Sequence, residues 1–316
     1  MKNLTKIKII GIGGSGCNAI SRMAKCKIKG IELIAINTDA QDLVKTKADV
    51  KLRIGRKTTQ GLGTGMNPEI GKKSALENRQ EILEILRGSD MVFIACGLGG
   101  GTGSGAAPVI AQTSKELGIL TLAVVTTPFS FEGQVRLRIA ENGLRRLKEN
   151  IDTLISISND KLLSILNHNT PLINAFWVCD DILRQAVQGI SDLILLPGII
   201  NVNFADVKAI MKDAGSALFG VGKARGEGRA EKAAISAINS PLLDASVKGA
   251  KGVLFNVSGG KDICLSEIDE VAKVITREVN PEAKIIFGAV QDEKPALHGT
   301  ALKQGEIKVT VIATGF

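Results

Sequence analysis

The residues with the clearest chemical signature are glycines. Six of them lie among the nine residues 97–105, at the start of the stretch GLGGGTGSGAAP (97–108). Glycine lets a ligand approach the backbone closely, and successive N–H groups in such a turn form a concave binding site for an anion. The following residues favour a helix, whose N-terminal dipole attracts negative charge. With the hydroxyl groups of Thr102 and Ser104, the stretch predicts a phosphate-binding loop.

Two further glycine loops favour the same kind of ligand. The stretch GIGGSG (11–16) fits the pattern G-x-G-x-x-G between a strand and a helix, which is typical of dinucleotide sites but also of ligand-free turns. We expect the third loop, GLGTG (61–65), to close over the far end of a phosphate chain. Loops that follow neighbouring parallel strands meet at one edge of a sheet. Together the three loops predict a polyphosphate ligand.

The motifs narrow the class of nucleotide site. The chain has no G-x-x-x-x-G-K-[ST] motif, which excludes a P-loop NTPase at the level of the motif. A nicotinamide-dependent oxidoreductase would use the first glycine loop and an acidic residue near the end of the second strand, where Asp39 is available. That alternative predicts NAD(H) binding and indifference to GTP, and it leaves the other two glycine loops unexplained.

The elements that must position these loops alternate along the first half of the chain. Short apolar runs predict strands at 7–12, 31–37, 91–96, 119–126 and 152–158. Helical segments lie between them, including 17–26 and 68–88. Such alternation predicts an α/β fold with a doubly wound, mostly parallel sheet.

The second half of the chain has a different predicted arrangement of elements, which begins with a long helix. Helical periodicity runs from 170 to 198, longer than in an average globular helix, and ends at Pro197-Gly198. Strands are expected at 216–224, 251–259, 283–290 and 307–315, and helices at 227–239 and 266–279. We therefore predict a nucleotide-binding, Rossmann-like domain (1–169), a long central connecting helix (170–198) and a smaller C-terminal α/β domain (199–316).

Composition excludes several classes of protein. The chain of 316 residues is 44% hydrophobic and 23% charged, which argues against global disorder. It has no apolar run of transmembrane length and no signal-peptide layout, so we expect a cytoplasmic protein without membrane insertion. Five scattered cysteines without a C-x-x-C pair, and only two histidines, favour buried, reduced thiols over disulfides or a zinc site.

The net charge of +8 is compatible with an anionic partner. However, the lysines and arginines are spread along the chain and lack the interleaved aromatic residues on which bases stack. Nucleic-acid binding would rest on charge alone, and we expect no nucleic-acid partner.

GGGTGSGAAP (99–108) resembles the signature of the tubulin/FtsZ family of GTPases, and its flanks are similar to the FtsZ branch. Further segments resemble the family in the same order: NTDAQDL (37–43), PFSFEG (128–133), VQGISDLI (187–194), FADVK (204–208) and VTVIATGF (309–316). The resemblance covers essentially the whole chain. It implies a GTP-binding domain, a central helix and a smaller C-terminal domain, in agreement with the division made above.

The resemblance also implies a nucleotide site. It assigns the first nucleotide loop to Gly14, Ser15, Gly16, Cys17 and Asn18, with Asn18 near the base and Cys17 in place of a common Asn. It assigns the phosphate loop to Gly101, Thr102 and Gly103, and the γ-phosphate loop to Thr64 and Gly65. Ribose contacts fall on Glu132 and Arg136, and guanine contacts on Asn159, Phe176 and Asp180.

Each of these residues also has a purely structural interpretation. Glu132 and Arg136 are spaced as an ordinary surface ion pair on a helix, Phe176 as a core residue, and Asp180 as part of a solvated stripe. The guanine assignment has chemical support, because a carboxylate accepts both the N1–H and the N2 amino group of guanine, a pair that adenine does not offer.

In this family the resemblance implies that hydrolysis takes place between subunits. The loop NVNFAD (201–206) of one molecule would complete the site of the next, with Asp206 as a catalytic acidic residue and Asn201 as a polar contact. Asn203 stands where the usual pattern has a second Asp, and an amide orients water but does not accept its proton. We expect GTP hydrolysis at a reduced rate; the alternative is a GTP-binding scaffold filament with little turnover.

The resemblance further implies GTP and GDP as ligands, with Mg2+ held mainly by the phosphates rather than by a cluster of protein side chains. It implies a head-to-tail homopolymer that forms the cytokinetic ring at mid-cell. Division-ring proteins would bind through a C-terminal tail that is absent from this chain, which ends at Phe316. Trp177, the single tryptophan, lies beside Phe176 and is expected to report nucleotide binding by fluorescence.

Overall fold

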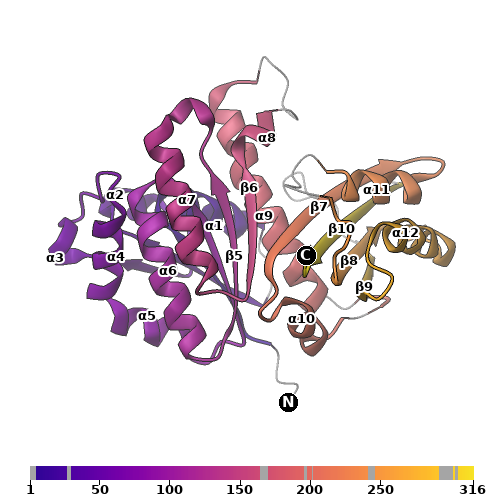
Figure 1. Ribbon diagram of the computed structural model, residues 1–316, viewed down its shortest axis with the longest axis horizontal. Helices are drawn as coiled ribbons and strands as arrows, with labels where there is room; N and C mark the ends of the chain where they lie inside the picture. The colour runs from indigo at the N-terminus through magenta and orange to yellow at the C-terminus, as the bar shows by residue number, and fades with distance from the viewer. Residues whose placement is uncertain are drawn as a thin grey trace. The chain divides into compact units, whose positions relative to one another are not determined.

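The computed structural model describes residues 5–26, 30–163, 170–195, 198–200, 202–240, 246–291, 302 and 305–316. The chain forms two compact units, Met1–Val187 and Gln188–Phe316 (Figure 1). The division falls inside the long helix α9 (Leu172–Leu195), within the segment where helical periodicity predicted a single helix.

The first unit is built on a parallel sheet. Its strands are β1 (Ile7–Ile12), β2 (Ile31–Asn37), β3 (Val50–Arg53), β4 (Met91–Gly97), β5 (Leu120–Thr127) and β6 (Thr153–Ser158). They lie in the order β3-β2-β1-β4-β5-β6, and neighbouring strands are parallel. This is the doubly wound order, in which the winding direction reverses between β1 and β4. The predicted fold class is confirmed for this unit.

Helices cover both faces of this sheet, as Figure 1 shows. They are α1 (Gly13–Cys26), α2 (Ala40–Lys45), α3 (Arg56–Thr59), α4 (Pro68–Glu77), α5 (Arg79–Leu86), α6 (Gly101–Glu116), α7 (Gln134–Lys148) and α8 (Asn159–Leu163). The core between the sheet and helices α5, α6 and α7 consists of aliphatic side chains such as Ile94, Ile110 and Leu147. Apolar strands buried on both faces explain the continuous apolar runs in the sequence.

The expectation of one helix over 68–88 was wrong. The structure divides this segment at Asn78, whose backbone (φ −108°, ψ 23°) leaves the helical region. The side-chain Oδ1 of Asn78 accepts a hydrogen bond from the N–H of Gly55, at 2.8 Å. The break therefore serves a tertiary contact that no local periodicity could indicate.

The second unit has a mixed sheet. Its elements are α10 (Phe204–Met211), β7 (Gly215–Arg225), α11 (Arg229–Ile238), β8 (Gly252–Gly259), α12 (Leu265–Glu278), β9 (Lys284–Gln291) and β10 (Glu306–Thr314). The strand order is β7-β10-β8-β9, with β10 antiparallel to both neighbours and β8 parallel to β9. Helices α11 and α12 pack on it over a core that includes Ala233, Phe255 and Ile275.

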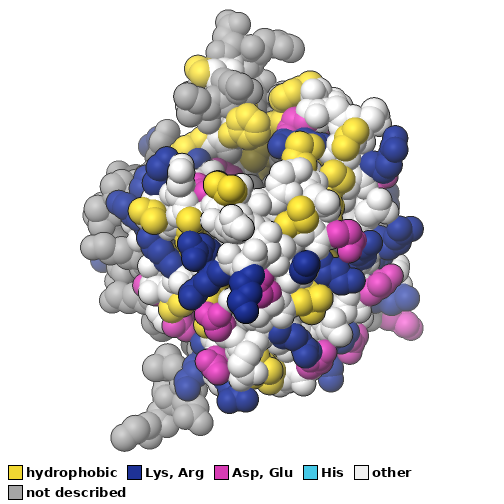
Figure 2. All heavy atoms as spheres, turned by 90° about the vertical axis from the view of Figure 1, so that its left-hand side faces the viewer, with side chains coloured by type: hydrophobic (Ala, Val, Ile, Leu, Met, Phe, Trp, Pro, Cys, Tyr) yellow, Lys and Arg dark blue, Asp and Glu magenta, His cyan; other side chains and the backbone are white. Residues whose placement is uncertain are grey.

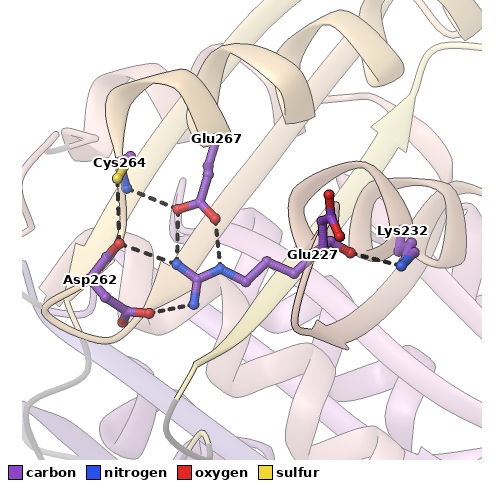
Figure 3. A network of polar contacts seen from close by, with 6 residues as sticks. Glu227, Lys232, Asp262, Cys264 and Glu267 are labelled. Carbon is purple, nitrogen blue, oxygen red and sulfur yellow. Dashed lines mark hydrogen bonds and ion pairs between the residues drawn. The ribbon is translucent and has the colours of Figure 1, made fainter.

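An arginine links the starts of helices α11 and α12 in the second unit. Arg229, at the start of α11, donates from Nε to Glu267 at 2.6 Å and from Nη1 to Asp262 at 2.5 Å (Figure 3). Glu267 also accepts from the N–H of Cys264, at 2.9 Å. Arg229 lowers the pKa of both carboxyl groups by hydrogen bonding to them. The network fixes the beginning of α12 against the beginning of α11.

The cysteine prediction holds for three residues and fails for one. Cys17, Cys96 and Cys179 are buried free thiols, and burial raises their pKa to about 12. Cys264 is also free, but it is exposed at the N-cap of α12. The side chain of Cys26 lies outside the described residues.

Candidate functional site

The two largest glycine loops end up at the switch point of the sheet. Helix α1 begins at Gly13, directly after β1, and α6 begins at Gly101, with three residues between it and the end of β4. From the sequence these helices were predicted to begin at Cys17 and, after the glycine run, near Gly105, so both predicted starts were about one turn too late. The glycine loops are thus the first turns of helices, whose N–H groups have no partner within the helix and favour an anion.

Some of these glycines serve packing and others do not. A Cβ atom at Gly16 would lie 2.4 Å from the carbonyl oxygen of Ala95, and one at Gly101 would lie 2.3 Å from Oγ1 of Thr64. At Gly100, by contrast, a Cβ would meet nothing within 4 Å, and its φ of −92° suits any residue. Open space beside bare backbone at Gly100 is what close approach of a phosphate group requires.

Thr102 joins three segments of the site. Its hydroxyl lies 2.7 Å from that of Thr38, which follows β2, and 3.5 Å from that of Thr64 in the third glycine loop. Gly65, which follows Thr64, is exposed and has a φ of +56° that favours glycine. Ser104 does not share this role, because its buried hydroxyl accepts a hydrogen bond from the N–H of Gly99 at 2.9 Å.

The remaining residues of the first two loops differ in their exposure to solvent. In the first loop Gly14 and Asn18 are exposed and Ser15 is half-buried, whereas Gly103 in the second loop is buried. The side chain of Cys17 is fully enclosed and packs with Ala35 and Leu43. A contact between Cys17 and a ligand would therefore involve its backbone, and its thiol contributes packing.

Glu132 and Arg136 form an ion pair at the end of β5. Glu132 closes a short 3-10 helix, η1 (Ser130–Glu132), and its Oε1 accepts from the N–H of Phe129 at 3.0 Å. Its other oxygen pairs with Arg136 on α7. The pair suits the proposed ribose side of the site, and equally suits the structural interpretation of a helix-capping ion pair.

Aromatic rings lie beside this turn. Phe129 is fully buried and stacks on Phe131, with ring centroids 4.9 Å apart. Phe176 on α9 meets Phe129 edge to face at 5.5 Å and remains 41% exposed. Phe176 is therefore not a core residue, and its exposed part is available to stack on a ligand.

Asp180 is buried and paired, rather than part of a solvated stripe. It is 7% exposed, and its Oδ2 accepts a hydrogen bond from Nη2 of Arg22 at 3.0 Å. Burial raises its pKa to about 6, against the opposing effect of Arg22. Arg22 in turn lies over the ring of Trp177, with Cζ 5.2 Å from the ring centroid. Such a buried carboxylate is typical of functional sites.

Among the described residues, two buried side-chain atoms near these groups have no hydrogen-bond partner. They are Oδ1 of Asn159, at the start of α8, and Nε of Arg22. Buried polar atoms are normally satisfied, so unpaired ones point to a missing hydrogen-bonding ligand or water. Asn159 was among the residues predicted for the site, whereas Arg22 was not. The signal was present, since Ser15, Asn18 and Arg22 are spaced so as to share one helix face.

The predicted catalytic residues lie in the second unit. Asn203 is the N-cap of α10; its Oδ1 accepts from the N–H of Asp206 at 2.8 Å, and Asp206 Oδ2 accepts from the N–H of Asn203 at 3.4 Å. The two form a capping box, which is the structural interpretation of this pair. Asn201 lies outside the described residues.

Other functions find less support in the site. Asp39, on which the oxidoreductase alternative depends, caps α2 by accepting from the N–H groups of Gln41 and Asp42. Within the described part of the chain, no group of three or more His, Cys, Asp or Glu side chains is placed to hold a metal ion. In that same part, no helix is both long and apolar enough to span a membrane.

Comparisons with known proteins agree with this arrangement. Residues 6–167 match the model of the Tubulin/FtsZ family, GTPase domain, and residues 215–316 match that of the FtsZ family, C-terminal domain. The empty FtsZ dimer from M. jannaschii is 47% identical, with a TM-score of 0.93 over 100% of this chain and 89% of that chain.

Two more distant structures share the fold. GDP-bound CetZ1 from Haloferax volcanii is 19% identical, with a TM-score of 0.83 over 99% of this chain and 94% of that chain. CetZ2 from the same organism, solved as a GTPγS-bound protofilament, has the same identity and TM-score over 98% of this chain and 92% of that chain. From its glycine loops, its fold and its match to FtsZ, the chain belongs to the tubulin/FtsZ family of GTPases.

Proposed function

We propose that this protein binds GTP at the carboxyl edge of the first unit's sheet, assembles head to tail into filaments, and hydrolyses GTP between adjacent subunits. The observation that carries the proposal is the pair of helix N-termini at the switch point, joined through Thr102 to the third glycine loop. Asp180 adds a buried carboxylate next to Ser15 of the first loop. An anion-binding edge beside such an acceptor suits a guanine nucleotide.

In this proposal the first unit holds the nucleotide. The phosphates lie against the first turns of α1 and α6, formed by Gly14, Ser15, Gly16, Cys17, Asn18, Gly101, Thr102 and Gly103, and against Thr64 and Gly65. Glu132 and Arg136 contact the ribose, and Asn159, Phe176 and Asp180 contact the guanine. Mg2+, held mainly by the phosphates of GTP, would neutralise part of their charge when bound.

Hydrolysis is assigned to the loop of the next subunit that contains Asn201, Asn203 and Asp206. Phosphoryl transfer depends mostly on positioning and electrostatics, so a carboxylate and two amides that orient the attacking water suffice for turnover. The FtsZ dimer among the similar structures supports self-association of this kind. Residues 1–169 would then form the GTP-binding domain, 170–198 the connecting helix, and 199–316 the domain that carries the catalytic loop.

The proposed cellular role is supported by the match to the FtsZ family. We propose that the filament forms the cytokinetic ring in the cytoplasm at mid-cell and that other division-ring proteins bind it. The proposal does not include a nucleic-acid partner. On the face of the molecule in Figure 2, Asp and Glu side chains lie among the Lys and Arg side chains, so the described part of this face is not a uniformly basic surface for a nucleic acid.

The test measures phosphate release from GTP at increasing protein concentration, with light scattering followed in the same sample. A site shared between subunits predicts that specific activity rises beyond a threshold concentration, together with scattering. Specific activity that is independent of concentration would contradict a shared site. No response to GTP in either signal would contradict the proposal as a whole.

A scaffold filament with little turnover is the second candidate, and one observation favours it. The side chains of Asn203 and Asp206 are hydrogen-bonded to each other's backbone within their own subunit, and Asn203 brings no negative charge. Scattering that rises with GTP while phosphate release stays at background would support this candidate over the first.

A further inference from the structure

The base side of the site contains an arginine that the assignments above do not use. Arg22 lies on α1, two turns behind the first glycine loop, and its side chain is 22% exposed. Its Nη2 donates to Asp180 Oδ2 at 3.0 Å, while its Nε is buried without a partner. Its Cζ lies over the ring of Trp177, 5.2 Å from the ring centroid. An unpaired buried N–H of a charged group is unfavourable, so this donor favours an acceptor on a bound ligand.

The Arg22–Asp180 pair presents a specific pattern of hydrogen-bonding groups. The guanidinium offers donors, and the carboxylate beside it offers two acceptor oxygens. The corresponding edge of guanine presents the acceptor O6, then the donors N1–H and the N2 amino group. Adenine presents a donor amino group where guanine has O6, which would face the guanidinium donor to donor. Complementarity of donors and acceptors therefore selects guanine.

We propose that Arg22 is a specificity-determining residue, which donates a hydrogen bond to O6 of guanine while Asp180 accepts from N1–H and the N2 amino group. This inference rests on the proposed function, because it assumes that the base lies against Asp180. It requires Trp177 to move from the guanidinium when the base binds. Trp177 is 52% exposed, so its displacement breaks few contacts, and its fluorescence reports the event.

The test is a binding series with diphosphates, monitored by Trp177 fluorescence and by calorimetry, with the full chain at pH 7.5. GDP is compared with 6-thio-GDP, which replaces only O6 by a weakly accepting sulfur, and with IDP, which lacks only the N2 amino group. A charge-assisted hydrogen bond predicts that the wild type binds 6-thio-GDP about tenfold more weakly than GDP. In Arg22→Met the ratio of the affinities for GDP and 6-thio-GDP should fall to about one, because the guanidinium donor is removed.

Controls separate the role in recognition from a role in folding. The preference for GDP over IDP, expressed as the ratio of their binding affinities, depends on Asp180. This ratio is expected to be the same in Arg22→Met as in wild type. Arg22→Lys keeps the charge beside Asp180 and is expected to retain part of the preference for O6. Arg87→Met removes an exposed arginine from the turn between α5 and β4 and should change neither affinity ratio.

The outcomes distinguish the inference from the proposed function. If wild type binds GDP no better than ADP, the proposed function fails. If wild type selects GDP but Arg22→Met keeps the tenfold preference over 6-thio-GDP, only the role of Arg22 is overturned. A third outcome is that Arg22→Met binds GDP more tightly than wild type while the ratio of the affinities for GDP and 6-thio-GDP is unchanged. This result would show that Arg22 competes with guanine for Asp180, and it would also overturn the inference.

Discussion

The hydroxyl groups of Thr38 and Thr102 lie 2.7 Å apart, both buried, where the segments after β2 and β4 meet. The same Thr102 hydroxyl lies 3.5 Å from that of Thr64, so one oxygen atom connects three loops at the edge of the sheet. Glycine-rich backbone is conformationally free, and side-chain contacts of this kind hold it in a binding geometry.

Thr102→Val tests this connection. The variant leaves the buried hydroxyl of Thr38 without its present partner, which should lower the free energy of unfolding by about 1–2 kcal/mol and weaken GDP binding. Thr113→Val is the matched control on the same helix, because the buried hydroxyl of Thr113 donates only to the carbonyl of Val109, one turn before it. Equal effects of the two variants on GDP affinity, measured by calorimetry, would contradict a special role for Thr102.

Much of the fold could be predicted from local pattern, because buried parallel strands are continuous apolar runs. The run at 91–96 is β4, and the long helical periodicity at 170–198 is α9. Strand β3 was missed because only Val50 and Leu52 among its four residues are apolar. The helix starts at Gly13 and Gly101 were placed too late because glycine has low helix propensity, which tertiary packing overrides here.

The site was predictable where its signal is local. The glycine loops identify the phosphate end, and the structure places them at one edge of the sheet. The partnership of Arg22 with Asp180 joins residues 158 positions apart, which no single motif contains. The buried state of Asp180 likewise depends on packing against α1, so a pattern of two adjacent acidic residues could not distinguish it from a solvated stripe.

The raised pKa of Asp180 predicts how stability depends on pH. Because its pKa is about 6 in the folded protein and 3.8 in an unfolded chain, the folded state binds this proton more tightly. The contribution of Asp180 to the free energy of unfolding therefore falls as pH rises from about 4 to about 6, by on the order of 3 kcal/mol. Asp180→Asn removes this dependence, so its stability relative to wild type should rise over that range.

Urea unfolding followed by Trp177 fluorescence measures this effect, because the single tryptophan lies in the same unit as Asp180. Parallel pH profiles for wild type and Asp180→Asn would contradict the prediction. GDP affinity provides a second measurement: it should fall below pH 6, because a protonated carboxyl accepts fewer hydrogen bonds than a carboxylate.

The loop at the start of α10 predicts opposite effects of two substitutions on turnover. Asn203→Asp preserves the N-cap of α10 and adds the negative charge that the usual pattern has there, so GTP turnover in filaments should rise. Asp206→Ala should lower turnover by about 100-fold while filaments still form. Phosphate release at equal light scattering is the measurement. A wild-type rate in Asp206→Ala filaments would contradict the catalytic assignment.

The Arg229 network predicts a stability effect confined to the second unit. Arg229→Met leaves Glu267, which is only 20% exposed, without its guanidinium partner, so the unit should lose about 2 kcal/mol of unfolding free energy at pH 7. Arg229 lowers the pKa of Glu267 below 4.5, so the difference from wild type should be constant above about pH 4.5 and shrink as pH falls through the lowered value.

Lys232→Met is the matched control for Arg229→Met. The ammonium of Lys232 donates at the surface to the carbonyl oxygen of Glu227, 2.7 Å away (Figure 3), and its loss should change stability by less than about 0.5 kcal/mol. Hydrogen exchange of the amides in α11 and α12 localises the effect to the unit concerned. Faster exchange in α11 and α12 of Arg229→Met alone is expected, because the contact that fixes the two helix starts is lost. Equal exchange in the two variants would contradict the prediction, because it would show that solvent replaces the hydrogen bonds of the arginine to Glu267 and Asp262 without loss.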